Sequence, residues 1–197
     1  PGKTEGTNFT GSLLVGHATT GTLNAASNNT GVGIAALDAL TSGDSNTAIG
    51  YQSGTKITTG GNNTAIGETS LFLNTSGSSN TAMGHQSLYA LASGSNNTAV
   101  GRVALSSTTG DNNVGIGKSA GSNITSGDGN VIIGVNTNAD SATGDRQLKI
   151  SGNDGSTATT WISGDSSGNV TVAGTLTTSS GLVAAQADVT ALAIALG

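Results

Sequence analysis

The stretch "NTAMGHQSLYALASGSNNTAVG", which runs from Asn80 to Gly101, begins and ends with nearly the same five letters. The motif "NTAMG" starts at Asn80, and "NTAVG" starts seventeen positions later at Asn97. A catalytic site brings unlike residues together, whereas like residues at a constant spacing are typical of a stacked architecture. In such a stack each unit packs on its neighbours, and together they bury a shared core. This stretch therefore predicts a repeat protein.

The same motif recurs along most of the chain. Relaxed forms of Asn-Thr-Ala-aliphatic-Gly occur eight times, and their closing glycines keep this seventeen-position spacing except for one interval that is a position shorter. A second glycine, preceded by Ser or Thr, closes most units. The closing glycines of the motif are Gly16, Gly33, Gly50, Gly67, Gly84, Gly101, Gly117 and Gly134.

Each unit predicts one coil of a parallel β-solenoid. The motif suits a short strand, and the second glycine with its Ser or Thr suits a turn with positive φ. Two glycines per unit oppose a helix. Stacked coils would align equivalent strands about 4.8 Å apart, and the repeated asparagines would form a hydrogen-bonded ladder. The residues expected to hold this frame are Asn46, Asn63, Asn80, Asn97, Gly50, Gly67, Gly84 and Gly101.

Strand alternation predicts two faces for each motif. Thr and the aliphatic residue share one face, while Asn, Ala and Gly share the other. We expect Met83 and Val100 to be buried together with Leu88 and Leu91, and we expect the small-residue face to allow close packing against another chain. Burial of about three large side chains per coil contributes roughly 2 kcal/mol each. This is small beside the conformational entropy lost on folding, which costs roughly 1–2 kcal/mol for each residue of the coil. A lone solenoid is therefore marginal, which predicts an oligomer.

The composition restricts the classes of partner. The net charge is −5 and there are only six Lys and Arg residues, which argues against nucleic-acid binding. No apolar run is long enough for membrane insertion. The absence of cysteine from the sequence excludes disulfides and thiolate metal sites. A chain that starts with Pro rather than Met suggests a fragment or a processed product.

The "NTAIG" units at Asn46 and Asn63 and the "NTAVG" unit at Asn97 resemble the head repeats of YadA-type trimeric autotransporter adhesins. The same repeat type occurs in phage tail-fibre proteins. The resemblance covers residues 11–144 and implies a left-handed parallel β-roll that assembles as a homotrimer. It also implies a non-enzymatic structural and host-recognition segment of a phage tail fibre, located in the virion. Its partner would be a polysaccharide or protein receptor on the host cell surface. The alternative is the head of an adhesin on a bacterial cell surface.

The chain divides into four segments. Residues 1–10 form an N-terminal flank, residues 11–144 the repeat domain, residues 145–180 a β junction, and residues 181–197 a C-terminal helix. In the junction, "RQLKISG" and "TTWISGDSSGNVTVAGTLTT" predict three strands. We expect Trp161 to cap the end of the rod.

The last segment is rich in Ala and free of Gly and Pro from Leu182 to Leu196, which predicts a helix. Its apolar residues fall at heptad spacings, so we expect a parallel three-helix clamp. An amphipathic helix that packs on its own chain is the alternative. The seam residues are Leu182, Val189, Leu192 and Leu196.

The position after each motif glycine changes its chemistry from coil to coil. It is Tyr51, Glu68, His85 and Arg102 in successive units. Variation within a fixed frame predicts an exposed column, and this column is the candidate receptor contact. A column of metal-binding histidines through His17 and His85 is the less favoured hypothesis.

Three acidic residues precede the Asn column at a similar phase. Asp44, Asp111 and Asp128 either cap turns, which we favour, or form a weak calcium site. The carboxylates are too scattered to predict a glycosidase pair. The sequence therefore predicts no catalytic residue, cofactor or metal site.

A third function comes from a different class. Threonine recurs at the same motif position in five coils, and a flat β-solenoid carrying such a rank could bind ice. A thermal-hysteresis assay would test this. The rank is Thr30, Thr47, Thr64, Thr81 and Thr98.

Overall fold

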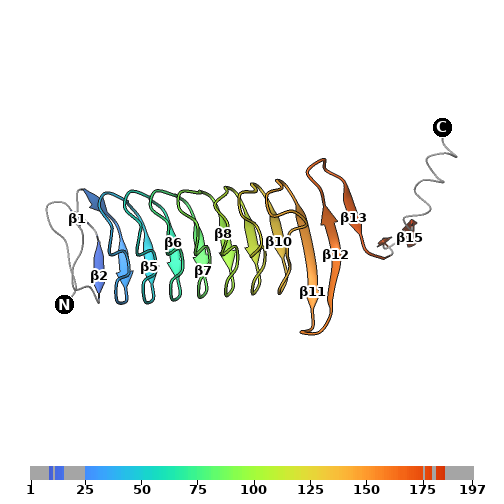
Figure 1. Cartoon of the computed structure of the whole chain (residues 1–197), viewed down its shortest axis with the longest axis horizontal. Coiled ribbons are helices and arrows are strands. Elements are labelled where there is room, and N and C mark those ends of the chain that lie inside the picture. The colour runs from blue at the N-terminus through green and yellow to red at the C-terminus, as the bar shows by residue number, and fades with distance from the viewer. Residues whose placement is uncertain (1–8, 11, 16–24, 175, 179–180, 185–197) are drawn as a thin grey trace.

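The computed structural model describes residues 9–10, 12–15, 25–174, 176–178 and 181–184, and none of these lies in a helix. They form a row of stacked coils that is extended at one end by antiparallel strands (Figure 1). The strands are β1 (Phe9–Thr10), β2 (Leu13–Val15), β3 (Ala26–Ser27), β4 (Thr30–Val32), β5 (Thr47–Ile49), β6 (Thr64–Ile66), β7 (Thr81–Met83), β8 (Thr98–Val100), β9 (Val114–Ile116), β10 (Val131–Ile133), β11 (Leu148–Asn153), β12 (Ala158–Gly164), β13 (Val170–Val172), β14 (Leu176–Thr178) and β15 (Gly181–Ala184).

The repeat sets the strand register. Strands β2 and β4 to β10 lie parallel, and each residue pairs with its equivalent in the next coil, as Ala48 does with Ala65. This confirms the predicted parallel β-solenoid, in which one coil corresponds to one sequence repeat. The sheet does not end at Gly144, because β11 continues the parallel register with Val131 opposite Leu148. Strands β12 and β13 then add antiparallel pairs and complete an eleven-stranded sheet.

The other side of each coil forms a second wall. Backbone hydrogen bonds join neighbouring coils there, for example from Leu71 N to Ser87 O at 2.9 Å and from Leu73 N to Tyr89 O at 3.1 Å. Every coil therefore has two hydrogen-bonded sides with a narrow interior between them.

The core fills this interior with small side chains from the sheet and large ones from the second wall. Leu88 and Leu91 are fully buried, as predicted. The sheet wall has room only for Ala or Gly in most coils: a Cβ added to Gly31 would lie 2.5 Å from Leu14 Cδ2. The buried residues of the two walls are Ala48, Ala65, Ala82 and Ala99 opposite Leu37, Leu40, Ile57, Leu71, Leu88, Leu91, Leu105 and Ile124.

The predicted assignment of the strand faces is wrong. The Asn and Ala face turns inward, and the Thr and aliphatic face turns outward. Met83 and Val100, which we expected in the core, are 41% and 36% exposed. Because the second wall already supplies the large side chains, the inward face of β4 to β9 has space only for Ala or Gly, whereas the end strands β2 and β10 turn Leu14 and Ile132 inward.

The two glycines of each unit serve different purposes. The motif glycines from Gly33 to Gly134 have φ between 125° and 136°, a region that residues with a side chain rarely adopt. The second glycines are not among the residues with positive φ, contrary to the prediction. They are required by close stacking instead: a Cβ at Gly60 would collide with the carbonyl oxygen of Gly77 in the next coil.

Two predictions for the C-terminal third are also corrected. Trp161 does not cap the coils, because it lies in β12 and is 53% exposed. Leu182, assigned to a helical seam, lies in strand β15 and pairs with Thr177 of β14. The other seam residues, Val189, Leu192 and Leu196, lie outside the described residues.

Candidate interaction surfaces

A ladder of asparagine side chains runs the length of the coils, as the sequence predicts. Asn63 Nδ2 donates to Asn46 Oδ1 at 3.0 Å and to the Gly77 carbonyl at 2.9 Å, and Asn63 N also donates to Asn46 Oδ1 at 3.0 Å. The ladder starts at Ser12, whose Oγ accepts from Asn29 N at 2.7 Å. It ends at Gln147, whose Nε2 donates to Asn130 Oδ1 at 3.1 Å. The asparagine side chains of the ladder are buried and hydrogen-bonded, so they hold the frame and offer nothing to a partner.

The outer face of the eleven-stranded sheet presents a continuous apolar stripe. The motif aliphatics project from it, and most of them are between 36% and 43% exposed. The pairing of Ile133 with Ile150, of Ile150 with Ile162 and of Ile162 with Val172 carries the stripe onto the antiparallel strands. We call this set the outer stripe: Val15, Val32, Ile49, Ile66, Met83, Val100, Ile116, Ile133, Ile150, Ile162 and Val172.

A second column runs beside the outer stripe. It carries the threonine rank, and all five threonines are half-buried on the outward side of their strands. The rank ends at Val114 and Val131, where two threonines are replaced by valine. The outer face is therefore regular in spacing and poor in charge.

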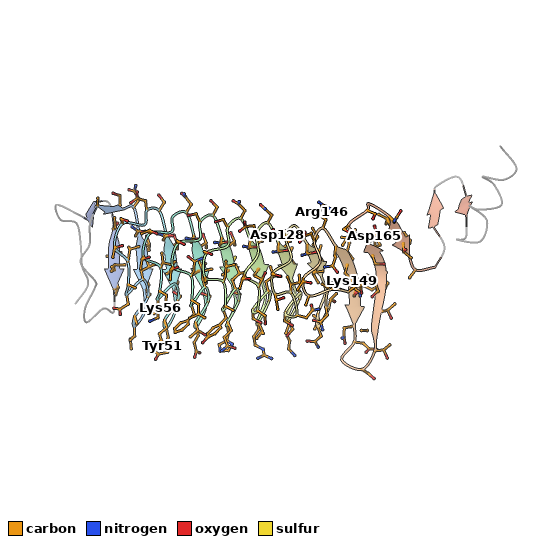
Figure 2. All side chains as sticks on the ribbon, turned by 45° about the horizontal axis from the view of Figure 1, so that its top comes forward. Tyr51, Lys56, Asp128, Arg146, Lys149 and Asp165 are labelled. Carbon is orange, nitrogen blue, oxygen red and sulfur yellow. The ribbon has the colours of Figure 1, made fainter. Side chains whose placement is uncertain are left out.

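The variable column lies along one long edge of the coils. Tyr51 is 50% exposed, and Glu68 and Arg102 are exposed as well. His85 is half-buried, and its Nδ1 is buried with no hydrogen-bond partner among the described residues. Figure 2 shows Tyr51 at this edge, with Asp128 and Arg146 at the opposite one. The column does not converge on a single site.

An aromatic pair on the second wall was missed by the sequence reasoning. The rings of Phe72 and Tyr89 stack with centroids 5.2 Å apart and an angle of 5° between their planes. Both residues stand one position after the Leu71 and Leu88 column, so the repeat spacing itself predicts the contact. A comparison of every column across the coils would have found it.

The acidic turn residues form a second ladder rather than a calcium site. Asp128 Oδ1 accepts from Asp111 N at 2.7 Å, and Asp111 Oδ1 accepts from Ser95 N at 2.7 Å. Asp44 Oδ1 likewise accepts from Ser27 N. Each carboxylate thus satisfies a backbone N–H of the preceding coil, which supports the turn-capping interpretation. The described residues contain no group of three or more His, Cys, Asp or Glu side chains that could hold a metal ion.

The junction between the coils and the antiparallel strands carries two hollows. One, of about 280 Å³, is bordered by Asp140, Asp145 and Asp165, and Asp140 forms an ion pair with Lys149. The other, of about 670 Å³, is an open depression with Trp161 among its lining residues. Among the described residues there is no helix with the length and apolar character needed to cross a membrane.

The sequence predicts the ladder and the exposed variable column, but it missed the outer stripe. The signal was present, because strict alternation of Thr and aliphatic residues defines one face of a strand. What the sequence lacks is the width of the coil interior, which decides which face turns inward. Comparison with known proteins adds no relative: no protein-family model, no curated protein and no solved structure matches this chain.

Proposed function

We propose that this chain is a non-enzymatic structural and host-recognition segment of a trimeric phage tail fibre. In this proposal the coils are left-handed, three chains lie side by side around one axis, and the assembly is part of the virion. A receptor on the host cell surface, a polysaccharide or a protein, is the partner. The clamp that Val189, Leu192 and Leu196 would add is part of the same proposal.

The outer stripe is the observation that carries the proposal. Its eleven strands extend over roughly 50 Å at about 4.8 Å per strand. A contiguous apolar surface of that length is uncommon on a monomer and marks a contact with another molecule. A flat, regular and nearly uncharged face also suits the same face of a second and a third copy. We therefore assign the interface to the Thr and aliphatic face, and not to the small-residue face that alternation alone suggested.

Sedimentation equilibrium tests this assembly. A homotrimer has three times the mass of one 18.9 kDa chain. A species at the mass of one chain, across micromolar concentrations, would contradict the trimer and the shared interface.

A variant of the outer stripe tests which face associates. Ile49 points outward at 41% exposure, so Ile49→Lys should leave the coil folded. It would bury a charge at the interface, and we expect at least a tenfold weaker association by sedimentation, which corresponds to about 1.4 kcal/mol. Thr59→Lys is the matched control, because Thr59 is exposed on a different column. If Ile49→Lys still assembles as the control does, the outer stripe is not the interface.

Host contact is assigned to surfaces that an assembled trimer leaves accessible. The variable column of Tyr51, Glu68, His85 and Arg102 fits this role because it lies on an edge of the coils and changes its chemistry from unit to unit. Loss of binding to host cells after a combined substitution of these four residues, with the trimer intact, would support the assignment.

The head of a bacterial adhesin is the alternative, and the same outer stripe and variable column would serve it. The flanking gene sequence distinguishes the two kinds of protein: an outer-membrane anchor would indicate the adhesin, and a tail-attachment domain would indicate the fibre.

One observation favours ice binding as a second candidate. The threonine rank points outward in register on a flat face, which is the arrangement that this activity requires. Association through the outer stripe would cover that rank, so the two functions compete for one surface. Thermal hysteresis measured for a monomeric chain would favour ice binding. A chain that forms trimers and shows no thermal hysteresis would exclude ice binding.

A further inference from the structure

Trp161 stands at an irregularity in the antiparallel extension. Ile150 pairs with Ile162, but the next residue, Ser151, pairs with Thr160, so Trp161 is an extra residue in β12. A β-bulge of this kind redirects a side chain and is frequent beside functional sites. Trp161 is 53% exposed and is the only tryptophan of the chain.

Gly152 provides the seat for the indole ring. A Cβ at Gly152 would collide with the Cζ2 and Cη2 atoms of Trp161, so the ring lies directly against the β11 backbone. One part of the ring is therefore fixed on the neighbouring strand, while the exposed part borders the hollow of about 670 Å³. The hollow is wide and open to solvent, so it suits one ring of a surface ligand rather than an enclosed small molecule.

The rim of the hollow is polar and partly preorganised. Besides Gly152 and Trp161, it consists of Asn153, Asp154, Thr157 and Thr159. Asp154 Oδ1 accepts from Thr157 N at 2.7 Å and from Ser156 N at 2.8 Å, which fixes the carboxylate.

These hydrogen bonds leave specific atoms for a ligand. The backbone N–H of Thr157 and then that of Ser156 lower the pKa of Asp154, so the group is ionised at neutral pH. Asn153 Oδ1 accepts from Gly155 N at 2.8 Å, so Nδ2 is the atom of this side chain that remains to donate to a ligand. The rim thus combines a donor at Asn153 with an acceptor at Asp154 Oδ2.

We propose that this hollow binds a neutral pyranose of a surface polysaccharide. The indole face attracts the polarised C–H bonds on one side of a sugar ring, while the hydroxyl groups at the ring edge bond to Asn153, Asp154 and the two threonines. The only charged side chain of the rim is the Asp154 carboxylate, which disfavours uronic and sialic acids. The inference rests on the proposed function, because it names the ligand class of the recognition segment.

The position of the hollow agrees with ligand access. The loop between β11 and β12 extends past the loops of the neighbouring coils (Figure 1). A polysaccharide chain could therefore reach the hollow without touching the coil loops.

The intrinsic fluorescence of the single tryptophan reports directly on this site. We expect a saturable emission change when the full chain is titrated with dextran, mannan or another neutral polysaccharide, and none with polygalacturonate as the anionic control. No change with any neutral polysaccharide would overturn the proposal. So would an emission maximum that shifts on dilution together with the trimer mass, because Trp161 would then pack against a neighbouring copy.

Variants make the test independent of folding. Affinity electrophoresis should show at least tenfold weaker binding for Trp161→Leu and Asn153→Ala, with partial recovery for Trp161→Phe, which keeps an aromatic face. Leu73→Ala is the control, since it removes an exposed apolar side chain from the second wall, which has no part in either proposed contact. If Trp161→Leu remains trimeric and still binds host cells and polysaccharide, this site is refuted while the fibre function stands. If wild-type trimer and cell binding both fail, the proposed function itself is refuted.

Discussion

At the scale of single residues, the hydrogen-bonded ladder explains why asparagine begins seven of the eight motifs. Each interior rung presents one carbonyl oxygen that accepts two hydrogen bonds from the next rung, and one amide that donates to two partners. Serine lacks the donor that reaches the glycine carbonyl, and aspartate lacks any donor at neutral pH. Serine therefore suits the first rung, where Ser12 only accepts, and asparagine is needed wherever a coil lies on both sides.

Removal of one rung tests this account. Asn63→Ala leaves Asn46 Oδ1 without its Nδ2 donor and the Gly77 carbonyl without a partner in a buried place. We expect a loss of about 2–4 kcal/mol in the free energy of unfolding, measured by urea denaturation. The control is Asn62→Gly, because Asn62 is exposed and its φ of 59° suits glycine. Equal effects of the two substitutions would show that the ladder adds no stability.

Asn74 is the opposite case, a buried asparagine without partners. It occupies the column of Leu40, Ile57 and Leu91, is fully buried, and neither its Nδ2 nor its Oδ1 has a hydrogen-bond partner among the described residues. Asn74→Leu should therefore raise the free energy of unfolding by about 1–3 kcal/mol. The buried Oγ1 of Thr108 also has no hydrogen-bond partner in the described part of the chain, so the isosteric Thr108→Val should give a smaller gain. A loss of stability in Asn74→Leu would mean that the amide makes a stabilising bond to an internal water.

At the scale of elements, the strands show which structural features the sequence alone predicts. The period predicts where each strand lies and which residues pair, because a one-residue slip would break every column at once. The direction of each face does not follow from alternation, which is symmetric between inside and outside. It follows from the second wall, since Leu71 and Leu88 occupy the interior and leave room only for Ala65 and Ala82. The C-terminal strand β15 shows the other limit: Gly181–Ala184, the start of the segment for which we predicted a helix, pairs as a strand with β14.

The β12–β13 turn gives a prediction for pH. Asp165 accepts hydrogen bonds from Asn169 Nδ2 at 2.8 Å and from the backbone N–H groups of Asn169 and Ser167. The Asn169 side chain and then its backbone N–H lower the pKa of Asp165 from 3.8. A lowered pKa in the folded chain means that the contribution is complete above the unfolded value and is lost as the pH falls through the folded value.

We therefore expect the turn to loosen selectively below about pH 4. Hydrogen exchange at the Ser167 and Asn169 amides, corrected for the intrinsic pH dependence, should accelerate there relative to the Ala65 amide in the coil sheet. Asp165→Asn should remove this acceleration, because the residue no longer titrates. An unchanged protection of both turn amides down to about pH 2 would contradict the assignment.

At the scale of the whole molecule, the coils form a linear array in which each unit contacts only its neighbours. Stability in such an array is close to a sum of unit and interface contributions. The left-handed backbone at corner residues such as Leu88 and Val103, with φ of 50° and 63°, costs about 1–2 kcal/mol each. This cost recurs in every coil, and the stacking bonds on both sides must offset it. The coil at the β2 edge of the sheet, which has a strand neighbour on one side only, should therefore open before the β10 coil, which β11 covers.

The deletion of one complete coil tests the array directly. Removal of residues 64–80 joins Asn63 to Thr81, so that Thr81 takes the place of Thr64 opposite Thr47 and Asn97 takes the place of Asn80 in the ladder. Because every column keeps its register, the shortened chain should fold to the same β-rich state. Its maximum dimension by small-angle X-ray scattering should fall by about 4.8 Å. Removal of residues 64–71 is the control, since it shifts all following columns and should abolish the cooperative unfolding transition. If both deletions were tolerated equally, the register of the repeat would not be what holds the coils together.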